Sequence, residues 1–146
     1  MESEFTKNFA IKFAGILFTL IPFTLLTGNF IPDTSIVIIS LIFLIITLKE
    51  SDYKYYNNYF FFLFIFFFIF ICSLSIISEN PIESLPSSLT YLRFGIFSLA
   101  VFYLLEKDKS LSRKFTIFFL FAFIFALIDG YYQFFFDKSI FNFVAL

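Results

Sequence analysis

The chain has 146 residues, of which 60% are hydrophobic and 14% are charged, with a formal net charge of -1. Soluble domains carry roughly 25% charged residues, so this composition excludes an ordinary soluble domain and predicts a membrane protein. There is no histidine and a single cysteine, Cys72. The composition therefore excludes a disulfide framework or a cysteine metal cluster within one chain, and disfavours a self-contained hydrolase or metalloenzyme.

Five apolar stretches approach the roughly 17 to 25 residues that a membrane-spanning helix needs. The sequence predicts an all-α, polytopic membrane helical bundle, a single membrane domain over residues 1–146. The expected spans are residues 10–27, 34–48, 59–77, 89–105 and 115–136. The connections, including "SENPIESLPSS", are short and polar. Whether the fifth helix ends at Gly130 or continues to Phe136 stays open at this point.

Lysine and arginine fall mostly on one side of this topology, the side that holds the N-terminus and the second and fourth connections. Because positive residues are retained on the cytoplasmic side, the N-terminus is expected in the cytoplasm and the acidic third connection outside. Tyr53, Tyr55, Tyr56 and Tyr59 flank the third span. Amphipathic tyrosine rings favour the headgroup region, so interfacial anchoring is expected for all four, and equally for the tyrosines at 131 and 132.

Arg93 and Asp129 are charges inside the fourth and fifth spans. Helical rise places Arg93 roughly 8 Å from the outer end of its span and Asp129 roughly 22 Å from the inner end of its own, so both are expected near the outer leaflet. Spans joined by a short loop are expected to be antiparallel neighbours, which predicts an Arg93–Asp129 ion pair. Gln133, one turn beyond Asp129, is expected on the same face.

Two interpretations of these charges stay open. In the first, they pair to hold two helices in register, or Arg93 extends to the outer headgroups. In the second, Arg93 lines an outward-facing polar cleft and binds an anion such as phosphate, with Asp129 orienting it, because the planar guanidinium binds phosphate oxygens in pairs and stays ionised. The sequence shows no P-loop, metal-ligand cluster or nucleic-acid patch.

The arrangement of short spans, "SLPSSLTYLRFGIFSLAVFYLL", a basic inner loop and "ALIDGYYQFFFDKSIFNF" resembles the N-terminal part of the O-antigen ligase and polymerase superfamily of bacterial inner-membrane proteins. Such glycosyltransferases of cell-envelope polysaccharide and lipopolysaccharide biosynthesis move a glycan from an undecaprenyl pyrophosphate carrier in a periplasmic cleft. The resemblance implies that Arg93 contacts the pyrophosphate or the glycan and that Asp129 and Gln133 support the same wall. No cofactor, no metal and no catalytic residue are expected in this chain.

The chain departs from the family pattern in two ways. Phe136 and Asn142 stand where the family often has glycines around the "IF" segment, and the later spans and large periplasmic loop, with its basic residues and a histidine, have no counterpart. The expectation is therefore an incomplete N-terminal portion that is inactive alone. The alternative is a complete small polytopic scaffold or subunit of an inner-membrane assembly, and a transporter component is a third, weaker reading.

Overall fold

The computed structural model describes residues 2–28 and 30–136, and all regular structure in these ranges is helical. Two short helical turns lie between longer helices, η1 between α1 and α2 and η2 between α2 and α3. The elements are α1 (Glu2–Thr24), η1 (Leu25–Thr27), α2 (Phe30–Glu50), η2 (Tyr53–Tyr55), α3 (Tyr59–Ile77), α4 (Pro81–Thr90), α5 (Leu92–Lys107) and α6 (Leu111–Phe136).

Five segments in the described ranges are long and apolar enough to cross a membrane, as the sequence predicted. They are Glu4–Thr27, Phe30–Glu50, Tyr59–Ile77, Pro81–Lys107 and Leu111–Phe136. The third matches its expected bounds, whereas the other four begin four to eight residues earlier than expected. The last helix passes through Gly130 and continues to Phe136, which answers the question left open by the sequence.

The third connection was predicted as a loop, and this prediction was wrong, because most of it forms α4. Pro81 stands in the first turn, where its missing N–H costs little. Serines hold α4 against α3: the hydroxyls of Ser75 and Ser88 are hydrogen-bonded, and those of Ser78 and Ser84 are 2.8 Å apart. Small polar side chains of this kind let two apolar helices approach closely, which explains why a polar stretch continues the span instead of interrupting it.

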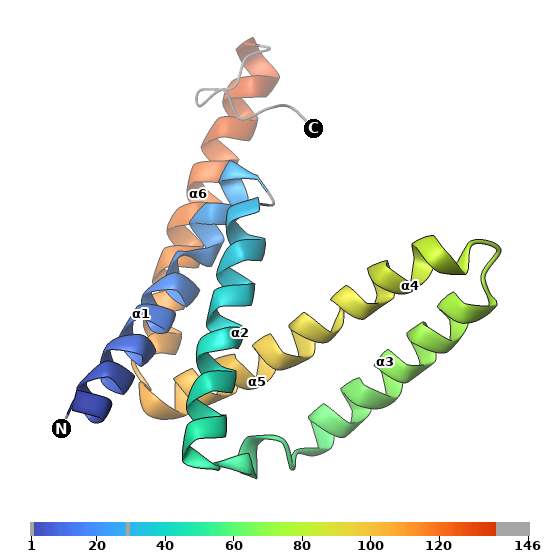
Figure 1. Ribbon diagram of the computed structural model, residues 1–146. Coiled ribbons are helices and arrows are strands. Elements are labelled where there is room, and N and C mark those ends of the chain that lie inside the picture. The colour runs from blue at the N-terminus through green and yellow to red at the C-terminus, as the bar shows by residue number, and fades with distance from the viewer. Residues whose placement is uncertain (1, 29, 137–146) are drawn as a thin grey trace.

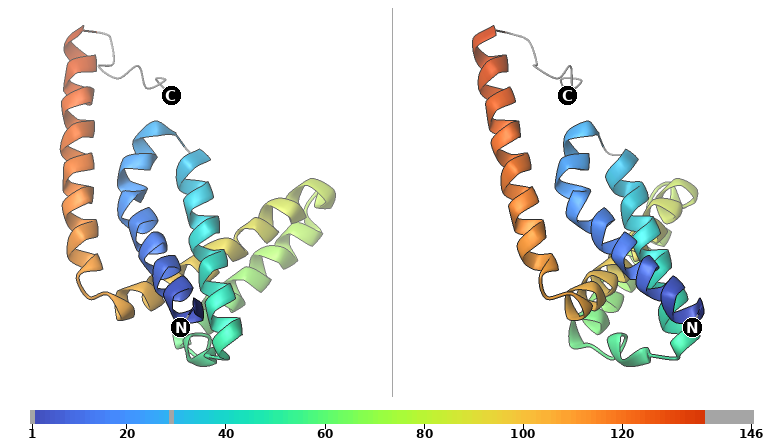
Figure 2. Two further views of the ribbon diagram at one scale, coloured as in Figure 1. Left: turned by 60° about the vertical axis from the view of Figure 1, so that its left-hand side comes forward. Right: turned by 90° about the vertical axis from the view of Figure 1, so that its left-hand side faces the viewer.

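The helices form two groups that diverge (Figure 1). In the first group, α1 packs between α2 and α6, and these three helices lie side by side. The second group, here called the arm, consists of α3 packed against α4 and α5. The arm joins the first group where α5 crosses α2, and its far end, at the α3–α4 connection, points away from α6 (Figure 2).

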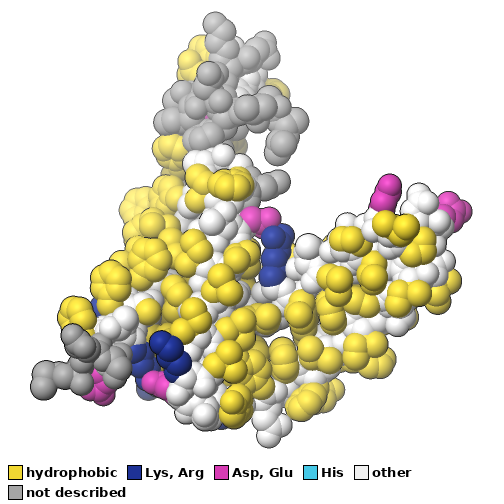
Figure 3. Space-filling model, in the orientation of Figure 1, with side chains coloured by type: hydrophobic (Ala, Val, Ile, Leu, Met, Phe, Trp, Pro, Cys, Tyr) yellow, Lys and Arg dark blue, Asp and Glu magenta, His cyan; other side chains and the backbone are white. Residues whose placement is uncertain are grey.

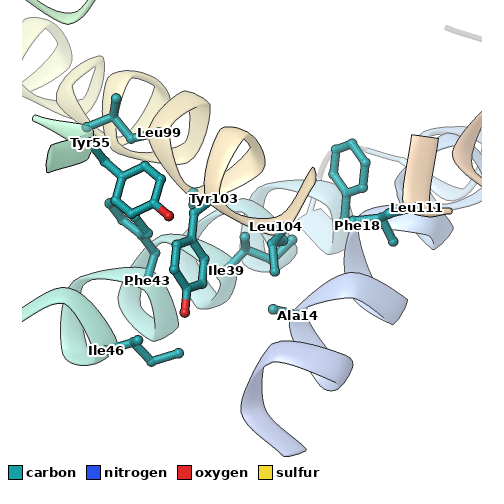
Figure 4. Packing of buried hydrophobic residues seen from close by; sticks show 11 residues of the cluster. Ala14, Phe18, Ile39, Phe43, Ile46, Tyr55, Leu99, Tyr103, Leu104 and Leu111 are labelled. Carbon is teal, nitrogen blue, oxygen red and sulfur yellow. The ribbon is translucent and has the colours of Figure 1, made fainter. Parts of the chain in front are cut away.

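The expectation that the fourth and fifth spans are antiparallel neighbours was wrong. α5 packs mainly against α2, while α6 packs mainly against α1 and meets α5 chiefly near their connection. The buried face of α5 explains this choice, since Leu99, Tyr103 and Leu104 pack with Ile39 and Phe43 of α2 in the core (Figure 4). A short connection therefore does not decide which face of a helix finds the larger complementary surface.

Tyr55 of η2 enters this core and is only 2% exposed, so its predicted interfacial position was wrong. Its ring lies 5.2 Å from the ring of Tyr103, which in turn lies 5.6 Å from that of Phe43, both in edge-to-face geometry. Aromatic pairs at such distances add stability beyond their buried area. Tyr53 and Tyr59 are exposed, as interfacial residues would be. The connection after α2 is thus fastened to α5 by its own side chain.

Candidate functional site

Arg93, at the start of α5, forms an ion pair with Asp33, in the first turn of α2. An Nη2 proton is donated to Asp33 Oδ2 over 3.0 Å. The predicted Arg93–Asp129 pair is therefore wrong, because α5 packs against α2 and its outer part diverges from α6 (Figure 2). Asp33 also lies where the amide dipoles of α2 favour a negative charge.

The span that holds Arg93 begins eight residues earlier than predicted. Arg93 lies near the middle of the continuous Pro81–Lys107 segment, yet its partner Asp33 is close to the N-terminal end of α2. These positions are compatible because the arm is strongly inclined to α2 (Figure 1), so that distance along the helix does not measure depth across the bundle. The pair thus lies towards the end of the bundle where α2 begins.

The Arg93–Asp33 pair borders an open hollow of about 380 Å³. Its lining residues are Phe30, Asp33, Thr34, Val37 and Arg93. The Arg93 side chain is 33% exposed and the Asp33 side chain is 47% exposed. Basic and acidic side chains meet at the notch between α2 and the arm in Figure 3. The pair can therefore be reached from outside the protein.

The guanidinium of Arg93 is held from two sides. Asp33 accepts from Nη2, and the guanidinium carbon lies 4.9 Å from the centre of the Phe94 ring, a cation–π distance. Its Nε is buried and has no hydrogen-bond partner among the described residues. A guanidinium has five N–H donors, so one carboxylate contact leaves donors for a further oxygen ligand.

Asp129 and Gln133 come together on one face of α6, as predicted. Asp129 is 8% exposed, and its Oδ2 accepts a hydrogen bond of 2.6 Å from Gln133 Nε2. The spacing of four residues brings the two side chains over each other on a helix. The structure thus brings together two of the three predicted site residues, while the third, Arg93, pairs with Asp33 of α2 instead. The "IF" part of the resemblance lies outside the described residues.

Asp33 is the site residue that the sequence analysis missed. It lies just before the expected span at residues 34–48, and the sequence analysis gave it no role. A useful signal was present, since Asp33 is a carboxylate at the same predicted side of the membrane as Arg93, as are Glu79 and Glu83 of the third connection. A charge within a membrane span is costly and usually pairs with an opposite charge. Every carboxylate at the predicted outer side was therefore a candidate partner for Arg93.

No group of three or more potential metal-ligating side chains is found among the described residues. Comparison of the chain with protein-family models, with curated proteins and with solved structures finds no match.

Proposed function

We propose that the chain is the N-terminal membrane portion of a lipid-linked glycan ligase or polymerase in the bacterial inner membrane. In this proposal its five apolar helices span the bilayer with the N-terminus in the cytoplasm. Arg93 then contacts the pyrophosphate of an undecaprenyl pyrophosphate carrier on the periplasmic side. The resemblance of the motifs around Arg93 and Asp129 supplies the substrate class.

The observation that carries the proposal is an arginine that is fixed in place and still accessible. Asp33 and the Phe94 ring orient the guanidinium at the edge of an open hollow. Arginine at such a place suits phosphate, because its planar fork donates two parallel hydrogen bonds to phosphate oxygens. The apolar side chains of Phe30 and Val37 in the same hollow suit the isoprenoid part of the carrier.

Asp129 and Gln133 belong to a second polar position on the same side of the membrane. They lie in the last turns of α6, and α6 ends at the side of the bundle where α2 begins (Figure 1). Because α6 and the arm diverge, Asp129 and Gln133 lie on a different side of the proposed site from Arg93. In the proposed function they contact the glycan by hydrogen bonds and leave the pyrophosphate to Arg93.

The first test is binding of undecaprenyl pyrophosphate to the protein in lipid nanodiscs. Hydrogen bonds to charged groups contribute about 1.5–3 kcal/mol, so Arg93→Gln should weaken binding roughly 10- to 100-fold, and Arg93→Lys should weaken it less. Lys54→Gln is the matched control, because Lys54 forms a 2.8 Å ion pair with Glu106 at the other end of the bundle. Equal binding by Arg93→Gln and the native protein would refute the role of Arg93.

A scaffold or subunit of an inner-membrane assembly is the second candidate function. One observation favours it: Arg93 already has a carboxylate partner, so the pair ties α2 to α5 without any ligand. Exchanging the charges, Asp33→Arg with Arg93→Asp, separates the two functions. A scaffold keeps its stability and its assembly after the exchange, whereas the carrier-binding protein folds and loses pyrophosphate binding.

A further inference from the structure

A second hollow lies at the end of the bundle opposite Arg93. That end, here called the basic end, contains the N-terminal part of α1 and the α5–α6 connection (Figure 1). Figure 3 shows lysine and arginine side chains on the visible part of this end, near the N-terminus. The basic side chains of this end in the sequence are Lys7, Lys12, Lys49, Lys54, Lys107, Lys109, Arg113 and Lys114.

The hollow has a volume of about 310 Å³ and is formed by three helices and a connection. α1 contributes Lys12 and Ile16, α5 contributes Leu104, and α6 contributes Leu111 and Lys114. Leu104 and Leu111 belong to the buried core, where Figure 4 shows them on the side of α1. The hollow therefore combines two ammonium groups at its rim with an aliphatic lining.

The charges of the lining do not cancel. Lys114 donates to Asp108 Oδ2 over 3.0 Å, while Lys12 has no ion pair among the described residues. The Asp108 carboxylate also accepts from the hydroxyl and the N–H of Ser110. The ammonium of Lys114 has three donors and uses one of them on Asp108. Two lysines and one aspartate leave a net positive charge that can accept an anion.

We propose that this hollow binds the phosphate headgroup of an anionic phospholipid of the adjacent leaflet. Lys12 and Lys114 contact the phosphate, and an acyl chain lies along Ile16, Leu104 and Leu111. Basic pockets between membrane helices at the level of the headgroups hold anionic lipids in this way. The aliphatic lining selects a lipid over a free phosphate. The site rests on the proposed placement of the five helices across a bilayer, but it lies away from Arg93, so it does not depend on binding of the carrier.

The test is native mass spectrometry of the protein released from bilayers that contain equal amounts of phosphatidylglycerol and phosphatidylcholine. The native protein should retain phosphatidylglycerol preferentially. A lysine near the membrane surface contributes about 1 kcal/mol, so Lys12→Gln should lower this preference about fivefold, and Lys12→Gln with Lys114→Gln should lower it further. Lys12→Gln is the cleaner variant, because it leaves the Lys114–Asp108 pair intact.

Arg113→Gln is the matched control. Arg113 is exposed, precedes Lys114 on α6 and does not line the hollow, so its variant should keep the lipid preference. An equal loss in Arg113→Gln and Lys12→Gln, with circular dichroism unchanged, would overturn the site in favour of general charge attraction. Displacement of the lipid by soluble glycerol phosphate at millimolar concentration would overturn the assignment to a lipid.

Discussion

α2 and α3 are both strongly apolar helices of span length, yet they meet different surroundings. α2 buries a stripe of seven residues against α1 and α5, whereas the only buried residue of α3 is Ser75. Apolar content does not explain why α2 is the more buried helix, since α3 is the more apolar of the two. The difference lies in the small and polar residues of the stripe, such as Ser35, Ser40 and Thr47, which allow close helix packing.

The difference in packing between α2 and α3 is tested most directly by truncating one phenylalanine on each helix. Phe43 on α2 is 2% exposed, and Phe66 on α3 is 71% exposed. Phe43→Ala leaves a core cavity and should lower the free energy of unfolding by about 3–5 kcal/mol. Phe66→Ala should change it by no more than about 0.5 kcal/mol. Unfolding by dodecyl sulfate in mixed micelles, followed by circular dichroism, measures both, and equal losses would contradict the described packing.

A second comparison uses two glycines. A methyl group on Gly95 of α5 would collide with the ring of Phe64 on α3, while one on Gly130 of α6 would meet no atom within 4 Å. Gly95→Ala should destabilise the arm by about 1–3 kcal/mol through overpacking. Gly130→Ala should stabilise α6 by about 0.5–1 kcal/mol, because alanine restricts the unfolded chain. The same micelle assay distinguishes them, and a stabilising Gly95→Ala would show that α3 does not pack there.

The smallest effect concerns the connection between well-packed α5 and exposed α6. Hydrogen bonds from the Ser110 hydroxyl, from Lys114 and from the Ser110 N–H lower the pKa of Asp108 to about 2. A lowered pKa means that this carboxylate stabilises the fold above its ordinary pKa of about 4, and that the contribution disappears as the pH falls to about 2. Asp108→Asn should remove this part of the pH dependence. A stability profile identical to that of the native protein would contradict it.

The sequence predicted the number of apolar helices of membrane-spanning length well, because hydropathy over about 20 residues reports directly on whether a helix can replace water by hydrocarbon. It predicted neighbours poorly. Arg93 was assigned to Asp129 from chain proximity, whereas Asp33 lies 60 positions away and meets it because α5 packs on α2. Local periodicity carries no information on such long-range choices when helices are apolar on all sides.

The candidate site was predicted in part for the same reason. Gln133 and Asp129 are one helical turn apart, so helical geometry alone brought them together. The burial of Tyr55 could not be predicted, since a tyrosine beside a span is equally suited to the interface and to a core. The α4 helix was missed because its two prolines, Pro81 and Pro86, and its serines are typical of loops. The contacts of the serines with α3 are what hold this stretch in place as a helix.

The fastening of η2 by Tyr55 has a consequence for biosynthesis. Tyr55 packs on Tyr103, so this contact joins positions 48 residues apart. At roughly 5–20 residues per second, Tyr103 is synthesised on the order of 2–10 s after Tyr55. During that time α3 contacts lipid or the insertion machinery in place of α5. A pause in translation between codons 56 and 103 therefore lengthens the period in which this helix can be captured by quality control.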